Sequence, residues 1–141
     1  MKKKSVGLIM AIMIPLTAIL VLFEDRHETL HASDRIKSTV RYVVDGDSLY
    51  LENHDPQIRL WGVDAPEKNE SGYNRAKNTL KQFALSKSVS CDIVDIDKYD
   101  RSVARCFLSD GREINRMMID SGTAKEYLRF TKGYYSSPQN K

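Results

Sequence analysis

The sequence predicts one α+β domain, mainly β, in which five strands form a small barrel flanked by helices and preceded by one N-terminal hydrophobic helix. Two observations support this fold class. Apolar and polar residues alternate in five short runs, and two further runs have helical spacing. Once an apolar N-terminal segment is set aside, the chain of 141 residues is long enough for one compact core and no second domain.

Three strands are expected between residues 38 and 63, where apolar residues alternate as in half-buried strands. The expected inward rows are Val40, Tyr42 and Val44, then Leu49 and Leu51, then Ile58 and Leu60. The tight turn Asp45-Gly46-Asp47 separates the first two strands, and a looser turn over residues 53–56 separates the second and third. The three strands therefore form a meander.

A helix is expected next, with Ser71 as its N-cap. Its apolar face consists of Tyr73, Ala76, Leu80, Phe83 and Ala84. Strand alternation resumes on both sides of the polar stretch 97–100, which predicts a hairpin. A second short helix follows and is expected to end near Gly122. This order suits a partly open Greek-key barrel of the OB type, whose loops commonly hold oligonucleotides.

The N-terminal segment is expected to enter the membrane. A basic stretch over residues 1–5 precedes an uncharged apolar run over residues 6–23, whose length falls in the range of about 17–25 residues that spans a bilayer. This favours a single-pass anchor in the cell membrane, or an uncleaved signal, joined by a linker over residues 24–37 to a domain over residues 38–130. Cleavage after Ala32 is the alternative and gives a secreted or periplasmic protein. Both interpretations place the domain outside the cytoplasm.

The charge of the chain is small for a nucleic-acid-binding protein. Lys and Arg number 22 against 19 Asp and Glu, a net charge of +3. Any affinity for nucleic acid must therefore come from a few placed cations rather than from a broad basic surface. The polar, turn-forming residues 131–141 predict a flexible C-terminal tail.

Two acidic turns are candidates for a metal site. Asp45 and Asp47 flank a glycine, and Asp64 and Glu67 flank an Ala-Pro step at the end of a strand. Ca²⁺ prefers several oxygen ligands, and loops at neighbouring strand ends can supply them together. Taken singly, each turn is better explained by the ordinary turn chemistry of Asp, Gly and Pro.

Two arginines extend this pattern. Arg59 lies on the strand face opposite the apolar row and close in sequence to the second acidic turn. Arg101 ends the polar hairpin tip, where a solvated turn cation is the ordinary alternative. Phosphodiester hydrolysis needs positive charge at the phosphoryl oxygens and a base for the attacking water, and these residues can supply both. The three histidines, His27, His31 and His54, form no alternative set.

Three short motifs occur in order along the predicted barrel. They are VVDGDSL at residues 43–49, RLWGVDAPE at residues 59–67 and DKYDRSVA at residues 97–104. Through them the sequence resembles the thermonuclease family, the staphylococcal-nuclease-like endonucleases, over residues 38–127. The resemblance implies an OB barrel and Ca²⁺-dependent hydrolysis of DNA and RNA with little sequence preference.

The resemblance also implies a role for each acidic residue. Asp47 and Asp64 resemble the metal-binding carboxylates, and the backbone carbonyl of Ala65 is implied as a further Ca²⁺ ligand. Glu67 resembles the general base that activates water. Asp45 matches an acid beside the metal.

Arg59 and Arg101 resemble the arginines that hold the scissile phosphate and stabilise its transition state. The family pattern is not kept everywhere. Asp100 stands where glycine is common, which adds a negative charge beside Arg101. Leu128 and Phe130 stand where relatives usually carry tyrosines that pack on the nucleotide.

The two cysteines, Cys91 and Cys106, lie at equal distances from the hairpin tip. A regular hairpin therefore places them opposite each other on one face. A disulfide and a pair of buried thiols are both compatible with this placement.

The leading hypothesis is a monomeric, calcium-dependent nuclease acting on DNA and RNA, tethered to the membrane or secreted. The alternative is a catalytically inactive OB module that binds nucleic acid or a protein partner at a membrane surface. A binding module has no need of Glu67 together with both arginines. The completeness of the site therefore favours the enzyme.

Overall fold

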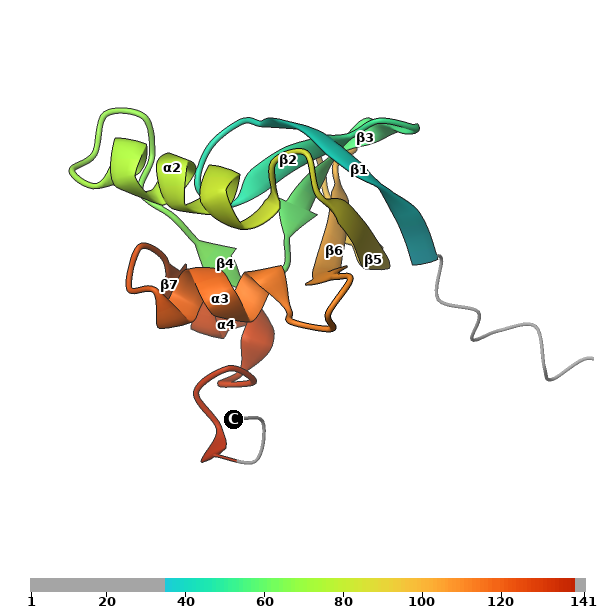
Figure 1. The fold of residues 1–141 in the computed structure, drawn as a ribbon. Coiled ribbons are helices and arrows are strands. Elements are labelled where there is room, and N and C mark those ends of the chain that lie inside the picture. The colour runs from blue at the N-terminus through green and yellow to red at the C-terminus, as the bar shows by residue number, and fades with distance from the viewer. Residues whose placement is uncertain (1–34, 139–141) are drawn as a thin grey trace, which may run out of the picture. The chain divides into compact units, whose positions relative to one another are not determined.

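A closed five-stranded barrel forms the centre of the computed structural model, which describes residues 35–138. Its strands are β1 (Arg35–Val43), β2 (Ser48–Leu51), β3 (His54–Leu60), β5 (Ser88–Ile96) and β6 (Ser102–Leu108). They neighbour one another in the order β1-β2-β3-β6-β5, and only β3 and β6 are parallel among these described strands (Figure 1). The predicted mainly β barrel of the OB type is confirmed.

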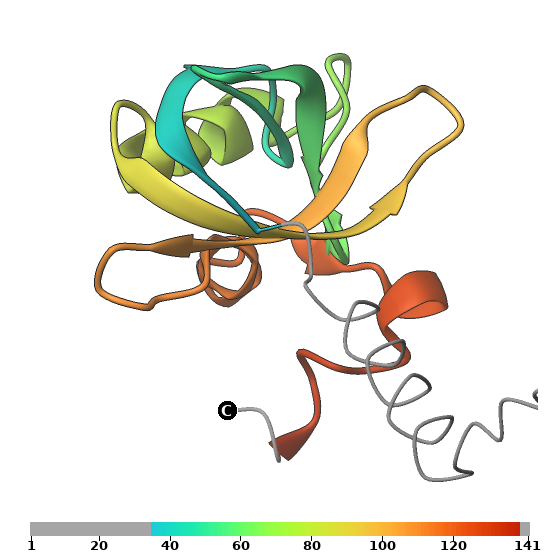
Figure 2. The same ribbon diagram turned by 90° about the vertical axis from the view of Figure 1, so that its right-hand side faces the viewer.

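Two helices, α2 (Tyr73–Ala84) and α3 (Ile114–Asp120), lie beside each other and cover one end of the barrel (Figures 1 and 2). The N-cap of α2 is Gly72 with a φ of 94° and not Ser71, so the predicted cap is wrong. The chain enters this helix through the left-handed region, which glycine adopts most easily. After α3, Gly122 has a φ of 69° and donates its N–H to the carbonyl of Ile119, as its place at the helix end predicts.

A small second sheet has no signal in the sequence. Its strands β4 (Val63–Asp64) and β7 (Lys125–Glu126) pair antiparallel, with Asp64 opposite Lys125. A four-residue helix, α4 (Leu128–Thr131), follows directly. Two-residue strands are too short to show alternation, so only the folded chain reveals that this sheet fixes the segment carrying Asp64.

A β-bulge changes the predicted inward row of β1. Pairing with β2 shifts between Val40 and Tyr42, so that the side chain of Tyr42 is 53% exposed, while Val40 and Val43 are both fully buried. Val40 faces inward as predicted, but Tyr42 and Val44 do not continue the inward row, and Val43 is buried in their place. An extra residue in one strand reverses the facing of every residue beyond it.

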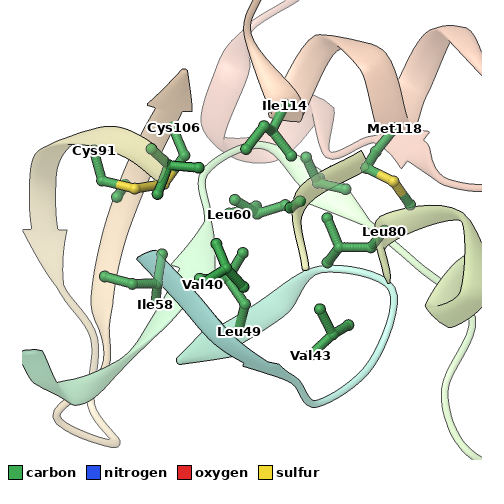
Figure 3. Packing of buried hydrophobic residues seen from close by; sticks show 14 of the residues in the cluster. Val40, Val43, Leu49, Ile58, Leu60, Leu80, Cys91, Cys106, Ile114 and Met118 are labelled. Carbon is green, nitrogen blue, oxygen red and sulfur yellow. A yellow bond between two sulfur atoms is a disulfide. The ribbon is translucent and has the colours of Figure 1, made fainter. Parts of the chain in front are cut away.

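The core fills the barrel and the space between the barrel and the two helices. Leu60 lies centrally, with Leu80 of α2 and Ile114 and Met118 of α3 packed towards it from the helices (Figure 3). All four side chains are fully buried. This packing holds α2 against the barrel, next to the turn between β1 and β2.

The two cysteines form a disulfide inside the barrel. Cys91 and Cys106 are directly opposite each other on β5 and β6, both fully buried, and their sulfurs are bonded (Figure 3). Of the two states that the sequence leaves open, the structure therefore has the disulfide.

Reduction of this disulfide is expected to lower the free energy of unfolding by about 3 kcal/mol, the loop-closure value for a loop of about 15 residues; the two cysteines are 15 positions apart. Urea unfolding with and without reductant measures the effect, and the double variant Cys91→Ala/Cys106→Ala serves as a control that reductant leaves unchanged. Two free thiols in the unfolded, unreduced protein would contradict the assignment.

Both boundaries of the domain differ from the expected ones. Strand β1 already begins at Arg35, inside the predicted linker. Where the sequence predicts a flexible tail from residue 131, the structure packs the chain onto the domain as far as residue 136. Tyr135 is 2% exposed, and it donates its hydroxyl to Glu113 at 2.7 Å and its N–H to Glu126 at 2.8 Å.

The predicted basic stretch and membrane segment, together with His27 and His31, fall within residues 1–34 and lie outside the described residues, as do residues 139–141. Among residues 35–138, no helix has the length and apolar character needed to cross a membrane.

Candidate active site

The first acidic turn is closed by its own backbone. The N–H groups of Val44 and Asp45 donate to the carbonyl of Ser48, and the N–H of Asp47 donates to the Asp45 carboxylate at 3.0 Å. Such an Asp side chain stabilises a turn two residues ahead of itself. The turn directs the side chain of Asp47 into the protein, where the residue is only 7% exposed.

Gly46 lets this turn make close contact with two other segments. A Cβ atom at Gly46 would lie 2.6 Å from the Cβ of Ala65 and 2.6 Å from the Cβ of Ala76 on α2. The first acidic turn therefore rests on the second acidic loop and on α2. The predicted meeting of the two loops occurs here: the N–H of Ala65 donates to Oδ2 of Asp47 at 3.1 Å.

Gly46→Ala is expected to lower the free energy of unfolding by about 1–3 kcal/mol, the cost of forcing an extra methyl group into a packed site. Urea unfolding measures this loss. The second variant Gly111→Ala adds a Cβ that meets nothing within 4 Å but places alanine at a φ of 87°, so its loss measures left-handed backbone strain alone. Unchanged stability of Gly46→Ala would contradict the close contact of this turn with Ala65 and Ala76.

Arg59 is paired with Asp47 inside the site. Its Nη2 lies 3.2 Å from Oδ2 of Asp47, and its Nη1 donates to the carbonyl of Leu60 at 3.0 Å. The side chains of Arg59 and Asp47 are 19% and 10% exposed. Ser48, which no sequence pattern singles out, donates its hydroxyl to Oδ1 of Asp47 at 2.9 Å. The carboxylate is therefore held on both oxygens.

Burial raises the pKa of the Asp47 carboxyl to about 6, from an ordinary value of 3.8. The cation of Arg59 opposes this rise, whereas the nearby carboxylate of Asp45 adds to it. The N–H of Ala65 and the hydroxyl of Ser48 also favour the ionised form. The cost of burying the carboxylate thus exceeds what Arg59, Ala65 and Ser48 together return, so the metal-free site keeps a proton on Asp47 to a higher pH than a free carboxyl does.

The raised pKa predicts that the metal-free protein loses stability as the pH rises from about 4 to about 6. In this window the folded protein keeps a proton on Asp47 that the unfolded chain has released, so the free energy of unfolding falls with rising pH, by on the order of 1–3 kcal/mol, and then stays level. A hydrogen bond from Arg35 lowers the pKa of Asp92, so this carboxyl loses its proton below the pH window and does not contribute within it.

Urea unfolding with chelator, at several pH values, tests this pH dependence against Asp47→Asn, which cannot ionise. The variant should gain stability relative to the native protein as the pH rises through the window. A stability difference that does not change with pH would contradict the raised pKa.

Asp64 and Glu67 are exposed residues on either side of the Ala65-Pro66 step, whose first N–H contacts Asp47. Asp64 ends β4, one residue before Ala65, and is fixed by the pairing of β4 with β7. Glu67 lies in the following loop, where its N–H donates to the carboxylate of Glu70 at 2.8 Å. Within residues 35–138, the side chain of Glu67 has no hydrogen-bond partner. Its carboxylate is therefore available to a solvent molecule.

Arg101 is held at the β5–β6 hairpin and has no direct contact with Asp47 or Arg59 among the described residues. Its Nε donates to Oδ2 of Asp97 at 2.7 Å. Asp100, where relatives commonly have glycine, takes the left-handed conformation with a φ of 58°. The partner of Arg101 is thus Asp97, which the sequence pattern marks only as part of a polar tip.

The register of β3 and β6 nevertheless places both arginines on one face. Arg59 on β3 is opposite Val103 on β6. Ser102, the residue before Val103, points inward and is 2% exposed, and Arg101 precedes Ser102. Alternation therefore directs Arg59, Val103 and Arg101 outward together. His54 does not contact either arginine among the described residues; its Nε2 lies 3.0 Å from the hydroxyl of Ser102.

The donors at this site fit a hard cation such as Ca²⁺. They comprise the carboxylates of Asp47 and Asp64 and the backbone carbonyl of Ala65, which are oxygen ligands of the kind Ca²⁺ prefers. The Asp47 carboxylate makes three polar contacts and has about four acceptor positions, so one is left for a metal. Residues 35–138 contain no group of three or more His, Cys, Asp or Glu side chains that could hold a metal. A metal held by Asp47 and Asp64 would take its remaining ligands from the carbonyl and from water.

Comparison with known proteins identifies a family for this chain. Residues 57–139 match the model of the family described as staphylococcal nuclease homologue. This stretch includes Arg59, Asp64, Glu67 and Arg101 and begins after Asp47.

Several curated relatives resemble more than half of the chain. The succinoglycan biosynthesis protein ExoI of Rhizobium meliloti (strain 1021) is 32% identical over 69% of this chain and 56% of its own length. A protein of Haemophilus influenzae named uncharacterized endonuclease is 32% identical over 82% of this chain and 65% of its own length. A protein of the same name from Escherichia coli O157:H7 is 28% identical over 67% of this chain and 63% of its own length. The chain thus spans 56 to 65% of these relatives.

Proposed function

This chain belongs to the staphylococcal nuclease homologue family, and from that premise we propose that it is a Ca²⁺-dependent nuclease. It hydrolyses phosphodiester bonds of DNA and RNA with low sequence specificity. The observation that carries the proposal is the buried carboxylate of Asp47, held between Arg59 and the backbone of Ala65 at the meeting of two acidic loops. The relatives named endonuclease support the same reaction class.

The proposed metal ligands are the carboxylates of Asp47 and Asp64 and the carbonyl of Ala65. When bound, Ca²⁺ supplies positive charge that offsets the charge of the phosphoryl oxygens. The pairing of Asp47 with Arg59 and Ser48 fixes the direction of its carboxylate before a metal arrives. Because the carboxylate is already fixed, it loses little conformational entropy when a metal binds, and this favours metal binding here over binding to flexible surface carboxylates.

Glu67 is the proposed general base. Its exposed carboxylate has no hydrogen-bond partner among the described side chains, so it can accept a proton from the attacking water. Arg59 and Arg101, directed to one outer face of the barrel, provide positive charge for the phosphate and for its transition state. The oxygen of the attacking water bonds to phosphorus as the bond from phosphorus to the leaving oxygen breaks, and the leaving oxygen takes a proton from solvent.

We further propose that the domain works outside the cytoplasm as a monomer, either anchored through residues 6–23 or released. The apolar run behind Lys2, Lys3 and Lys4 supports export. The disulfide between Cys91 and Cys106 supports an oxidising compartment. Fractionation of cells that express the full chain tests the anchor: recovery of all the protein in the soluble extracellular fraction would contradict it.

A catalytically inactive OB module that binds nucleic acid is the second candidate. Arg101 is the observation that favours it, because this guanidinium is already engaged by Asp97 at 2.7 Å and is preceded in the chain by a further carboxylate, that of Asp100. A phosphate must compete with Asp97 for this cation. Such competition costs catalysis more than it costs binding elsewhere on the domain.

Incubation of the purified full chain with a panel of substrates separates the two candidates. The panel contains single-stranded DNA, duplex DNA and RNA, each with Ca²⁺, and Glu67→Gln purified in parallel controls for contaminating nucleases. The enzyme proposal expects fragments from all three polymers, with the native protein only. Retarded but intact polymer would favour the binding module.

A further inference from the structure

Three tyrosines and two cations form a surface beside the acidic turn. Tyr42 of β1 and Tyr50 of β2 are cross-strand partners, and Tyr73 begins α2. The ammonium of Lys77 lies 5.8 Å from the ring centre of Tyr42 and 5.9 Å from that of Tyr73, and the guanidinium of Arg41 lies 5.1 Å from that of Tyr50. We call these five residues the tyrosine–lysine patch.

The β-bulge in β1 exposes this patch. Without the bulge, strict alternation would turn either Arg41 or Tyr42 into the core, whereas both are exposed in the structure. Tyr42 is 53% exposed although it lies only three residues before Asp45. Bulges beside functional sites commonly redirect a side chain in this way.

The patch is contiguous with the proposed metal loop. The hydroxyl of Tyr73 donates to the carbonyl of Val44 at 3.4 Å, and Ala76, one turn further along α2, lies against Gly46 of the acidic turn. In the barrel order β1-β2-β3-β6-β5, Arg59 and Arg101 lie on the β3–β6 side of that turn. The patch lies on its β1 side, so Asp47 stands between two groups of cations.

The charge of the two elements that carry most of the patch is entirely positive. Strand β1 contains Arg35, Lys37 and Arg41, and α2 contains Arg75, Lys77 and Lys81. Neither element contains an Asp or a Glu. Arg35 is paired with Asp92 at the start of β1, away from the acidic turn. The cations of Arg41 and Lys77, nearer the turn, are therefore a local excess of positive charge despite the small net charge of the whole chain.

We propose that the tyrosine–lysine patch binds the nucleotides of a single strand that extend beyond the scissile phosphate. This inference rests on the proposed function, because it takes the phosphate at Asp47 as one end of the bound strand. Unpaired bases can stack on the exposed ring of Tyr42 while Lys77 and Arg41 contact the phosphates between them. In a duplex the bases face each other, so the patch favours single-stranded DNA or RNA.

A single strand suits the patch better than an anionic lipid surface does. Its cations lie over tyrosine rings rather than beside long aliphatic side chains, and stacked rings match the flat faces of bases. Insertion into a lipid interface relies instead on a large apolar area. Vesicles are therefore included in the test as a competing ligand.

The test measures binding of fluorescent single-stranded oligodeoxynucleotides to the full chain by anisotropy, with chelator present to prevent cleavage. One probe is a dinucleotide and the other has about 12 nucleotides, within the range that an OB fold covers. Tyr42→Ala and Lys77→Gln are the variants. Arg112→Gln, which removes one exposed cation from the turn after β6, is the control with matched charge.

Tyr42→Ala is expected to weaken binding of the long probe about tenfold, within the range for losing one stacked base. Lys77→Gln should weaken it several-fold and lower the slope of log affinity against log salt by about 0.7, the value for one phosphate contact on a single strand. Binding of the dinucleotide should not change in either variant, and Arg112→Gln should bind both probes as the native protein does.

Equal affinity of the native protein and both variants for the long probe would overturn the proposal, as would no binding of this probe by the native protein. Equal weakening with the dinucleotide would also overturn it, because the patch would then not be an extension. The proposal would also be overturned if the two variants bound phosphatidylglycerol vesicles more weakly than the native protein but bound the long probe equally well. These measurements need no catalysis, so a negative result in the nuclease assay can be told apart from a negative result at the patch.

Discussion

Glu67→Gln is expected to reduce the rate of phosphodiester cleavage by about 10²- to 10⁴-fold, the usual contribution of a positioned proton-transfer group. The amide of glutamine has the shape of the carboxylate but cannot accept a proton from water. Because the side chain of Glu67 is exposed, the variant should fold and unfold like the native protein. The rate is measured at saturating Ca²⁺ and substrate, so that binding does not limit it.

A matched control for this variant is Glu52→Gln, which removes the same charge from the exposed turn between β2 and β3. Its cleavage rate should equal that of the native protein. Normal cleavage by Glu67→Gln would remove Glu67 from the proposed mechanism. A parallel thermal melt of all three proteins separates a catalytic loss from a loss of folded protein.

Arg59→Met is expected to reduce cleavage by about 10²- to 10³-fold, which is typical of losing one charged or hydrogen-bonding group at a transition state. Two effects act together. The phosphate loses a cation, and Asp47 loses the neighbour that opposes the rise of its pKa. More of the Asp47 carboxyl should then be protonated near pH 7, which weakens Ca²⁺ binding.

Arg59→Lys is the informative companion to this variant. Lysine keeps the charge beside Asp47 but cannot reproduce the planar guanidinium that donates through Nη1 to Leu60 and contacts Asp47 through Nη2. It should restore Ca²⁺ affinity, measured by calorimetry, more fully than it restores cleavage. Equal Ca²⁺ affinity in the native protein and Arg59→Met would contradict the coupling of Arg59 to Asp47.

Most of the fold could be predicted from the sequence because its elements have a regular period. Apolar alternation locates the five barrel strands, and helical spacing locates α2 and α3. Alternation fails at β1, where a bulge exposes Tyr42 and buries Val43. A bulge depends on how β1 pairs with β2, which no local pattern in β1 records.

The grouping of residues in the candidate site follows from strand ends, and this part could be predicted from the sequence. The structure brings Asp47 to Ala65 and Arg59 because β2, β3 and the loop after β4 meet at one edge. The importance of Gly46 could not be predicted, since the contact with Ala76 joins segments 30 positions apart. The pairing of Arg101 with Asp97 likewise depends on the closed geometry of the hairpin.

Asp47 is the residue around which we propose that a Ca²⁺-dependent phosphodiesterase site is organised. The most direct measurement follows cleavage of single-stranded DNA by the full chain in chelator, then after Ca²⁺ is added in excess, for the native protein and for Asp47→Asn. We predict no cleavage in chelator, rapid cleavage by the native protein after Ca²⁺ is added, and little or none by the folded variant. Cleavage by the native protein that persists in chelator, or that Asp47→Asn matches, would contradict this role of Asp47.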